Sequence, residues 1–272
     1  MTDRYAVIGN PVAHSRSPEI HAAFARECGV DIQYERLLAP LGGFVGTVDA
    51  FRNSGASGAS VTLPFKREAF DYANIRTARA ERGRSANTLR FENNKIVGDS
   101  TDGVGLCRDI IGNLDQPLQG ARILLIGAGG AARGVVGALL DCRPEILVIA
   151  NRTHANAETI VKEIAAGDLF CAIAFAALRT RSFDVLINAT SAGLTESLTP
   201  LPISCFAQNA LAYDMVYGKG ATPFLALAAS TGARTADGMG MLVEQAAEAF
   251  YVWRGVRPST GPVIDHMKKT AS

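Results

Sequence analysis

The sequence predicts an α/β protein of 272 residues in which strands and helices alternate along the chain. Short apolar runs, typical of buried strands, are separated by longer segments with helical periodicity. This alternation implies mostly parallel sheets with helices packed on both faces. The length exceeds the roughly 100 to 200 residues of a typical single domain, so the chain is expected to form one large domain or two smaller ones. A glycine-rich turn at Gly127 starts a fresh series of strands and helices, which favours two domains.

Short apolar runs mark the expected strands. They lie at Tyr5–Ile8, Gln33–Leu38, Ala59–Thr62, Thr88–Phe91, Ile123–Ile126, Ile146–Ala150, Phe170–Ala174, Val185–Ala189 and Leu211–Asp214. Helices are expected to fill most of the gaps. From Gly103 to Leu114, apolar residues recur at the spacing of one helix face, so a second domain begins near Gly103. The last helical pattern, around Met239–Arg254, has no strand after it and is expected to return to the first domain.

The composition is that of a globular protein, with 48% hydrophobic and 19% charged residues. A net charge of +1 offers no strong field to collect nucleic acid or anionic lipid, so neither is an expected partner. No apolar run approaches the length of about 20 residues that spans a bilayer, and the first residues lack a signal peptide. The five cysteines form no C-x-x-C pair and the four histidines do not converge. We therefore expect reduced thiols, a cytoplasmic protein and no metal site.

A strand, a glycine turn and a helix follow one another in "RILLIGAGGAARGVV". Gly127, Gly129 and Ala132 fit the G-x-G-x-x-A form of the dinucleotide fingerprint. In this motif the turn is tight, the backbone approaches a pyrophosphate, and the start of the helix offers unpaired N–H groups to its charge. A tight connection without a ligand is the alternative, and the strand-to-helix context favours the nucleotide site.

The next strand, "EILVIANRT", indicates which dinucleotide is bound. An NAD site usually places an acidic residue about 20 residues beyond the fingerprint, on the ribose 2′-hydroxyl. Here the strand is followed by Asn151, Arg152 and Thr153, with no acid. A guanidinium group pairs with a phosphate through two hydrogen bonds, so NADP is the predicted cofactor. The alternative is that Arg152 is an ordinary surface arginine.

Two charged residues in the first half are candidates for chemistry. In "GASVTLPFKREAF" the strand stops at Pro64, which holds Lys66 near the carboxyl end of a strand, where α/β sites usually lie. In "GDSTDGVG" the residue Asp102 sits in a polar turn before a helix. A surface lysine and a helix N-cap are the respective alternatives.

Taken together, the motifs of this chain resemble the shikimate dehydrogenase family over nearly the whole length. They are "GNPVAHSRSP", "VTLPFK", "ANTL", "GDSTDGVGL", "GAGGAARGV", "NRT", "NATSAGL", "YDMVYGKGATPFL" and "DGMGMLVEQAAEAF". The resemblance implies an N-terminal α/β substrate domain completed by the C-terminal helix, residues 1–102 and 237–272. It implies a doubly wound, Rossmann-type NADP domain at 103–236. The implied reaction is the reversible, NADPH-dependent reduction of 3-dehydroshikimate to shikimate in aromatic amino-acid biosynthesis, by a monomer or homodimer.

The resemblance also assigns roles to residues. Lys66 and Asp102 become the catalytic pair. Substrate contacts are implied for Ser15, Ser17, Thr62, Asn87, Tyr217 and Gln245. Cofactor contacts are implied for Gly127, Ala128, Gly129, Gly130, Ala131, Asn151, Arg152, Thr153, Met215 and Gly238. A lysine beside a carboxylate suits this chemistry, because a partly desolvated ammonium can give or take a proton near neutral pH.

Physical arguments bear on two of the implied substrate contacts. Hydroxyls one residue apart, at Ser15 and Ser17, can both donate to one anion, although Ser17 before Pro18 is also typical of a helix N-cap. Gln245 lies at the edge of the apolar face of its helix and needs a partner, for which a neighbouring backbone group is an equal candidate. Glu244 and Glu248 are expected to point away from that face.

The chain departs from the usual family pattern at four positions. Ser60 replaces an asparagine before the catalytic lysine, Arg84 and Ser85 replace small or apolar residues before Asn87, and Ser100 replaces the asparagine of G-D-N-T-D-G. We expect Ser60, Arg84 and Ser85 to weaken substrate binding and the reaction type to be kept. The alternatives are a quinate-type dehydrogenase on the same scaffold and an impaired NADP-binding homologue.

Overall fold

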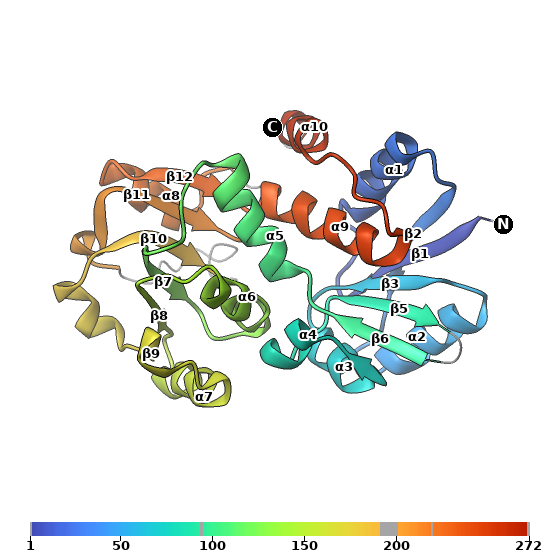
Figure 1. Ribbon diagram of the computed structural model, residues 1–272, viewed down its shortest axis with the longest axis horizontal. Coiled ribbons are helices and arrows are strands. Elements are labelled where there is room, and N and C mark those ends of the chain that lie inside the picture. Colours follow the sequence, from blue (N-terminus) through green and yellow to red (C-terminus); the bar gives the residue numbers. More distant parts are fainter. Residues whose placement is uncertain (1, 93–94, 191–200, 219, 271–272) are drawn as a thin grey trace.

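The computed structural model describes residues 2–92, 95–190, 201–218 and 220–270, and it has two lobes, each built on one sheet (Figure 1). The first sheet holds β1 to β6 and the second holds β7 to β12. Helices α5 and α9 lie between the lobes (Figure 1). In these described ranges, no helix has the length and apolar character to cross a bilayer.

The first sheet is mixed, in the order β2-β1-β3-β5-β6-β4. Its strands are β1 (Asp3–Gly9), β2 (Ile32–Leu38), β3 (Gly58–Val61), β4 (Ile75–Arg76), β5 (Thr88–Glu92) and β6 (Lys95–Asp99). Strand β1 is parallel to β2 and β3, but β5 runs antiparallel to both β3 and β6. Strand β4 is parallel to β6, so the sheet is mostly parallel, as predicted, with β5 as the reversed strand. Since β5 and β6 follow each other closely, no crossover helix separates them, and such neighbours pair antiparallel.

The second sheet is fully parallel, in the order β12-β11-β10-β7-β8-β9. Its strands are β7 (Arg122–Ile126), β8 (Ile146–Ala150), β9 (Phe170–Ala172), β10 (Phe183–Asn188), β11 (Phe206–Asp214) and β12 (Arg234–Asp237). The chain winds outward from β7 in both directions, which is the doubly wound order of a dinucleotide-binding domain. Ligands of such sheets bind where the winding reverses, beyond the carboxyl ends of β7 and β10.

The helices lie between the strands, as predicted, and they differ from the prediction at two places. They are α1 (Ser17–Cys28), α2 (Phe44–Asn53), α3 (Lys66–Tyr72), α4 (Ala78–Gly83), α5 (Asp102–Arg108), α6 (Gly130–Asp141), α7 (His154–Ile164), α8 (Pro223–Ser230), α9 (Met239–Arg254) and α10 (Gly261–Thr270). Short 3-10 turns lie at Gly167–Leu169, Phe175–Thr180 and Ile203–Cys205. The helix expected from Gly103 to Leu114 divides into α5 and a π-helical turn at Asp109–Asn113, and α10 was not predicted.

Alternating residues along the strands of the second sheet pack into two separate hydrophobic cores. Ile123 and Leu125 pack in one core with α6 and α7, and Leu124 and Ile126 pack in the other with α8. This alternation is the period of a strand with both faces covered, as predicted for this lobe. All five cysteines are free thiols.

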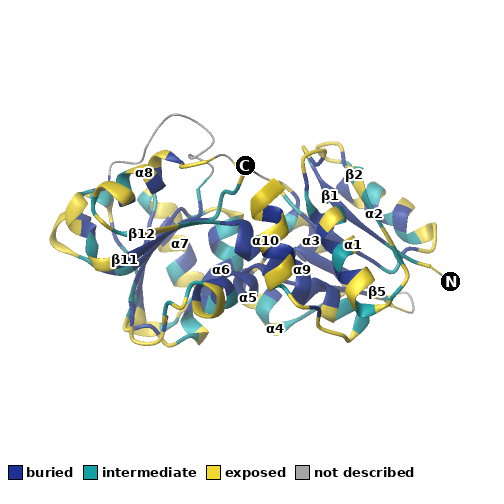
Figure 2. Ribbon diagram, turned by 90° about the horizontal axis from the view of Figure 1, so that it is seen from above, coloured by how far each residue is buried: buried dark blue, intermediate teal, exposed yellow. Residues whose placement is uncertain are grey.

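The C-terminal helix α9 returns to the first lobe, as predicted. Phe250 and Val243 of α9 pack with Ile20 and Phe24 of α1 and with residues of α10. On its other side α9 meets α5, whose apolar residues belong to the core of the second lobe. A Cβ added at Gly105 of α5 would lie 2.6 Å from a backbone nitrogen of α9, so the two helices are in close contact. Figure 2 shows buried residues concentrated in the sheets and along these two helices.

Candidate active site

A buried ion pair joins the two predicted catalytic residues. Lys66 is the first residue of α3, just after β3, and Asp102 is the first residue of α5. The Lys66 Nζ donates to Asp102 Oδ2 at 2.7 Å, with the two side chains 15% and 7% exposed. Thr101, not Asp102, occupies the N-cap position of α5. The carboxylate is thus directed at the lysine, and the low exposure limits the screening of the pair by solvent and salt.

Asn87 links this ion pair to α9. It lies directly before β5, and its Nδ2 donates to Asp102 Oδ1 at 3.1 Å and to Gln245 Oε1 at 3.2 Å. Its Oδ1 accepts the backbone N–H of Thr101 at 2.7 Å. Groups from β5, α5 and α9 therefore converge at one point.

Gln245 has two hydrogen-bond partners, and one of them is the neighbouring backbone group that was the alternative to a substrate contact. Its Nε2 donates to the carbonyl of Leu242 at 2.8 Å, within its own helix, and its Oε1 accepts from Asn87. The sequence placed the neighbouring acids away from the apolar face and gave no information on their burial. Glu244 and Glu248 are 7% and 5% exposed and are buried among polar partners from other elements. A helical pattern by itself assigns charged residues to solvent, and it carries no information on partners that tertiary structure supplies.

The two predicted carboxylate-binding serines lie together at the start of α1. Ser15 Oγ donates to Ser17 Oγ at 3.1 Å, and both residues are buried. Ser17 is not the N-cap, because that position belongs to Arg16 and no side-chain capping bond is formed there. Both hydroxyls are therefore available to a shared ligand.

Sequence reasoning missed a third hydroxyl next to these serines. The Tyr34 hydroxyl donates to Ser60 Oγ at 2.8 Å. Burial raises the pKa of Tyr34, and its hydrogen bonds with Ser60 and Ser17 offset only part of that rise. Tyr34 thus remains a neutral donor beside Ser17. Tyr34 lies in a predicted strand, and a strand pattern alone does not indicate that its hydroxyl contacts α1.

Thr62 and Tyr217 complete the predicted substrate contacts. Thr62 follows β3, and its methyl group would lie 2.3 Å from a Cβ at Gly9, so only glycine fits there. Tyr217 follows β11 and packs against the core shared by α1, α9 and α10. Burial raises the pKa of Tyr217, and the nearby charge of Arg16 lowers it in part. Arg16 lies between the two serines in sequence, so Tyr217 is near the serine pair although it comes from the second lobe.

The glycine turn has the shape that a dinucleotide needs. Gly127 follows β7 with φ at +111°, and a Cβ there would lie 2.9 Å from Thr190 Cγ2. By contrast, a Cβ at Gly129 or Gly130 would meet nothing within 4 Å, so the backbone faces open space. Helix α6 begins at Gly130 with no side-chain cap on its first turn. Its N–H groups are therefore offered to a ligand, which fits a pyrophosphate. Ala128 and Ala131 pack on the core beneath.

The residues after β8 form an exposed turn. Asn151 Nδ2 donates to the carbonyl of Thr153 at 2.9 Å, and Arg152 and Thr153 are exposed before α7. The guanidinium is therefore accessible to a phosphate group. A dinucleotide lying across the glycine turn would bring its 2′ substituent to this second strand end.

Met215 and Gly238 meet on the other side of the reversal point. A Cβ at Gly238 would lie 2.4 Å from the carbonyl oxygen of Met215, so β11 and the start of α9 are in backbone contact. The motif "NATSAGL", from the sequence resemblance, lies partly outside the described residues.

The ion pair lies close to the glycine turn. A Cβ at Gly134 of α6 would be 3.1 Å from Asp102 Oδ2. Gly134 is four residues after the start of α6, about 6 Å along its axis at 1.5 Å per residue. An ammonium and a carboxylate at this distance from a dinucleotide site can exchange a proton with a ligand held between the lobes.

The four departures from the family pattern have different surroundings. Ser60 accepts from Tyr34, and Arg84 pairs with Glu163 of α7 at 3.6 Å. The hydroxyls of Ser85 and Ser100 are buried, and among the described residues they have no hydrogen-bond partner. Arg84 thus contributes an ion pair between the lobes.

Three family models match successive parts of the chain. "Shikimate dehydrogenase substrate binding domain" matches residues 7–89, "Shikimate / quinate 5-dehydrogenase" matches 109–196, and "Shikimate 5'-dehydrogenase C-terminal domain" matches 238–268. Among curated relatives, "Shikimate dehydrogenase (NADP(+))" of Nitrosospira multiformis is 54% identical over 271 residues, 99% of this chain and 98% of the relative. The protein of the same name from Chromobacterium violaceum is 52% identical over 270 residues, 99% of each chain.

Solved structures show the same likeness. An Ael1 enzyme from Pseudomonas putida superposes with a TM-score of 0.93 at 48% identity, over 97% of this chain and 98% of that chain. The shikimate 5-dehydrogenase of Thermus thermophilus, solved with NADP(H) and shikimate, has a TM-score of 0.88 at 31% identity, over 100% of both chains.

Proposed function

The chain belongs to the shikimate dehydrogenase family, and we propose that Lys66 and Asp102 transfer the proton when it reduces 3-dehydroshikimate to shikimate. By this membership it is an NADP-dependent oxidoreductase of aromatic amino-acid biosynthesis. The observation that carries the proposal is the 2.7 Å contact between Lys66 Nζ and Asp102 Oδ2, next to the glycine turn.

The geometry gives the lysine and the aspartate different tasks. One proton of the Lys66 ammonium is directed at Asp102, which leaves others for the oxygen of a ligand. Asp102 accepts from Lys66 through Oδ2 and from Asn87 through Oδ1, so both oxygens are oriented by hydrogen bonds. In the reductive direction Lys66 donates a proton to the substrate C3 oxygen, and Asp102 holds the ammonium at that oxygen.

We assign the substrate carboxylate to the serine pair. Ser15 and Ser17 lie side by side and are buried, which favours charge-assisted hydrogen bonds to an anion. The ring hydroxyls are assigned to Thr62, Asn87, Tyr217 and Gln245, which come from both lobes. A substrate held by both lobes orders them around the reacting carbon and excludes water from it.

The cofactor residues fit an NADP molecule across the second sheet. Gly127, Ala128, Gly129, Gly130 and Ala131 would hold the pyrophosphate, and Asn151, Arg152 and Thr153 would hold the 2′-phosphate. Met215 and Gly238 would border the nicotinamide, which supplies or accepts the hydride when bound. The open space above Gly129 and Gly130 supports this assignment.

We further propose the division of the chain into 1–102 with 237–272 and 103–236. Strand β12 ends at Asp237 and α5 starts at Asp102, so each boundary lies one residue inside the end of an element. We propose a cytoplasmic monomer or homodimer that binds a small-molecule substrate.

One assay tests the proposal. NADPH absorbance is followed with shikimate and NADP, then with quinate, then with NAD, for the wild type and for Lys66→Ala. We expect turnover of shikimate with NADP that is lost in Lys66→Ala, while a titration shows that the variant still binds shikimate. Faster turnover of quinate would favour a quinate-type dehydrogenase, and turnover that survives in Lys66→Ala would refute the role of the lysine.

A further inference from the structure

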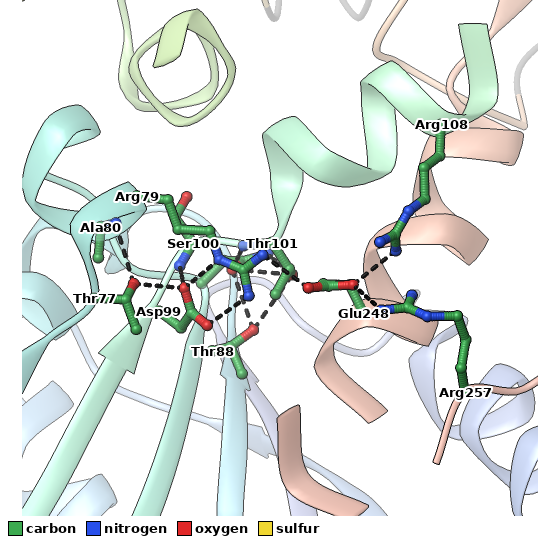
Figure 3. Close-up of polar contacts among 11 residues, drawn as sticks. Thr77, Arg79, Ala80, Thr88, Asp99, Ser100, Thr101, Arg108, Glu248 and Arg257 are labelled. Carbon is green, nitrogen blue, oxygen red and sulfur yellow. Dashed lines mark hydrogen bonds and ion pairs between the residues drawn. The ribbon is translucent and has the colours of Figure 1, made fainter. Parts of the chain in front are cut away.

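A cluster of two buried carboxylates and three partly exposed arginines lies beside the proposed site and joins four elements (Figure 3). We call it the arginine cluster, and it consists of Arg79, Asp99, Arg108, Glu248 and Arg257. Arg79 binds both oxygens of Asp99, at 2.6 and 2.7 Å, and its third contact is Glu248 Oε1 at 2.7 Å. Arg108 and Arg257 share Glu248 Oε2 at 2.7 and 2.8 Å.

The two carboxylates of the cluster are withdrawn from solvent and remain charged. The side chains of Asp99 and Glu248 are 5% and 7% exposed. Burial raises the pKa of Glu248, but hydrogen bonds from Arg79, Arg257 and Arg108 outweigh it and hold the pKa at about 2. Burial also raises the pKa of Asp99, and Arg79 and Thr77 more than offset it. The cluster is therefore ionised at neutral pH.

Asp99 connects the cluster to the catalytic carboxylate. Its carbonyl accepts the N–H of Asn87 at 3.0 Å, and its Oδ1 accepts the N–H of Ser100 at 2.7 Å. Asn87 then donates to Asp102. The position of the chain from Ser100 to Asp102 thus depends on the side chain of Asp99, which Arg79 holds at both oxygens.

Glu248 connects the cluster to the other side of the site. It lies three residues after Gln245 on α9, and the same helix is bound to Arg79 of α4. Arg79 is the member of the cluster that contacts both carboxylates, one from β6 and one from α9. A guanidinium group suits this place, because its planar fork binds two acceptors in fixed directions and stays protonated.

We propose that Arg79 is a positioning residue for the reaction, because it ties the strand end that precedes Asp102 to the helix that carries Gln245. This inference rests on the proposed function. Without Arg79, Asp99 and Glu248 repel each other. The contacts of Asn87 and Arg108 remain, but the end of β6 before Asp102 is no longer tied to α9 through Arg79. The reacting groups then sample misaligned positions, where a shift of about 1 Å can cost 100-fold in rate.

A pocket makes this residue accessible to a chemical test. It has a volume of about 470 Å³ and is lined by Arg79, Asp99, Arg82 and Asp141 among others, between α4, α5 and α6. Arg79 is 34% exposed. A guanidinium ion is much smaller than this volume, so it can reach the place that Arg79→Ala would vacate and bind both carboxylates.

The test is the reduction of 3-dehydroshikimate by Arg79→Ala with and without millimolar guanidinium chloride, against potassium chloride at equal ionic strength. We expect kcat to fall about 10- to 100-fold, a smaller change in KM, and recovery of at least part of the kcat with guanidinium only.

Arg82→Ala is the matched control. Arg82 lies on the same helix and lines the same pocket, but its partner Asp141 is exposed. We expect kcat within about twofold of the wild type and no response to guanidinium, as for an exposed ion pair. Arg79→Lys serves if Arg79→Ala does not fold. It keeps the charge but loses the planar fork of the guanidinium, and it is expected to show a smaller loss of kcat than Arg79→Ala.

The outcomes separate the inference from the proposed function. A wild type without turnover of shikimate would overturn the proposed function and this inference with it. An active wild type with Arg79→Ala within twofold of it would overturn the inference alone. A fall in kcat with no recovery in guanidinium would also overturn it, because loss of structure alone gives that result.

Discussion

Lys66 binds the carboxylate of Asp102, and Arg79 binds two other carboxylates nearby, but the two cations suit different tasks. Lys66 has one acidic partner, at 2.7 Å, whereas Arg79 has two and belongs to a group of three arginines around Glu248. An ammonium can release a proton near neutral pH when its surroundings permit, and a guanidinium keeps its proton. The difference teaches that charge alone does not define a catalytic site. The single pair is suited to proton transfer and the arginine cluster to holding elements in place.

Replacing the lysine at the catalytic position by an arginine gives the largest expected effect. Lys66→Arg keeps a positive charge opposite Asp102 but offers no group that releases a proton. We expect kcat to fall by about 1,000-fold or more, within the range for loss of a general acid, with shikimate binding changed little. Steady-state kinetics and a shikimate titration on the same preparation measure both. A variant with a tenth of wild-type kcat or more would show that charge is sufficient.

Neutralising Glu248 tests whether the arginine cluster holds its elements in place. Glu248→Gln leaves Arg108 and Arg257 without a counter-charge, and we expect a loss of about 2 to 4 kcal/mol in the free energy of unfolding at pH 7. The pKa of Glu248 falls on folding, so its contribution is present above its ordinary pKa of 4.5 and is lost as the pH drops toward about 2. The difference between wild type and variant should therefore shrink below pH 4.5.

Urea unfolding of both proteins from pH 7 to pH 3 measures this difference. Asp168→Asn is a suitable control, because Asp168 is exposed in a short turn and its removal should change stability little. A difference in unfolding free energy between wild type and Glu248→Gln that does not change with pH would contradict the conclusion that the cluster is ionised.

The smallest expected effect concerns Arg152, an exposed arginine proposed to hold a phosphate. In Arg152→Ala the ratio of kcat/KM for NADP over NAD should fall about 10-fold, because one charge-assisted contact to the 2′-phosphate is lost. Activity with NAD should stay near its wild-type value. Arg179→Ala, a change at another exposed arginine of the same lobe, is the control. An unchanged cofactor ratio would make Arg152 an ordinary surface residue.

The local part of this structure could be predicted from the sequence. Apolar runs gave β8 with its observed bounds and most other strands to within a few residues, because a buried strand needs continuous apolar side chains. The family resemblance predicted Lys66 and Asp102 as a pair, and the two side chains are in contact at 2.7 Å. The strands β4, β6 and β12 were missed, because they are short or have few apolar residues.

The arginine cluster could not be predicted in the same way. Its members come from α4, β6, α5, α9 and the segment after α9, and a sequence pattern gives no pairing between such distant positions. Glu244 and Glu248 were therefore only placed away from the apolar face, with no partner predicted. Burying a carboxylate costs several kcal/mol unless partners compensate it, and only the folded chain reveals the three arginines that do so.

The most direct test of the account is the rate of 3-dehydroshikimate reduction by Asp102→Asn. Asparagine keeps the size of the side chain and removes its negative charge. If Asp102 orients the Lys66 ammonium at the substrate, kcat falls by about 100-fold. A variant with nearly wild-type kcat would contradict the central claim that these two residues together perform the proton transfer.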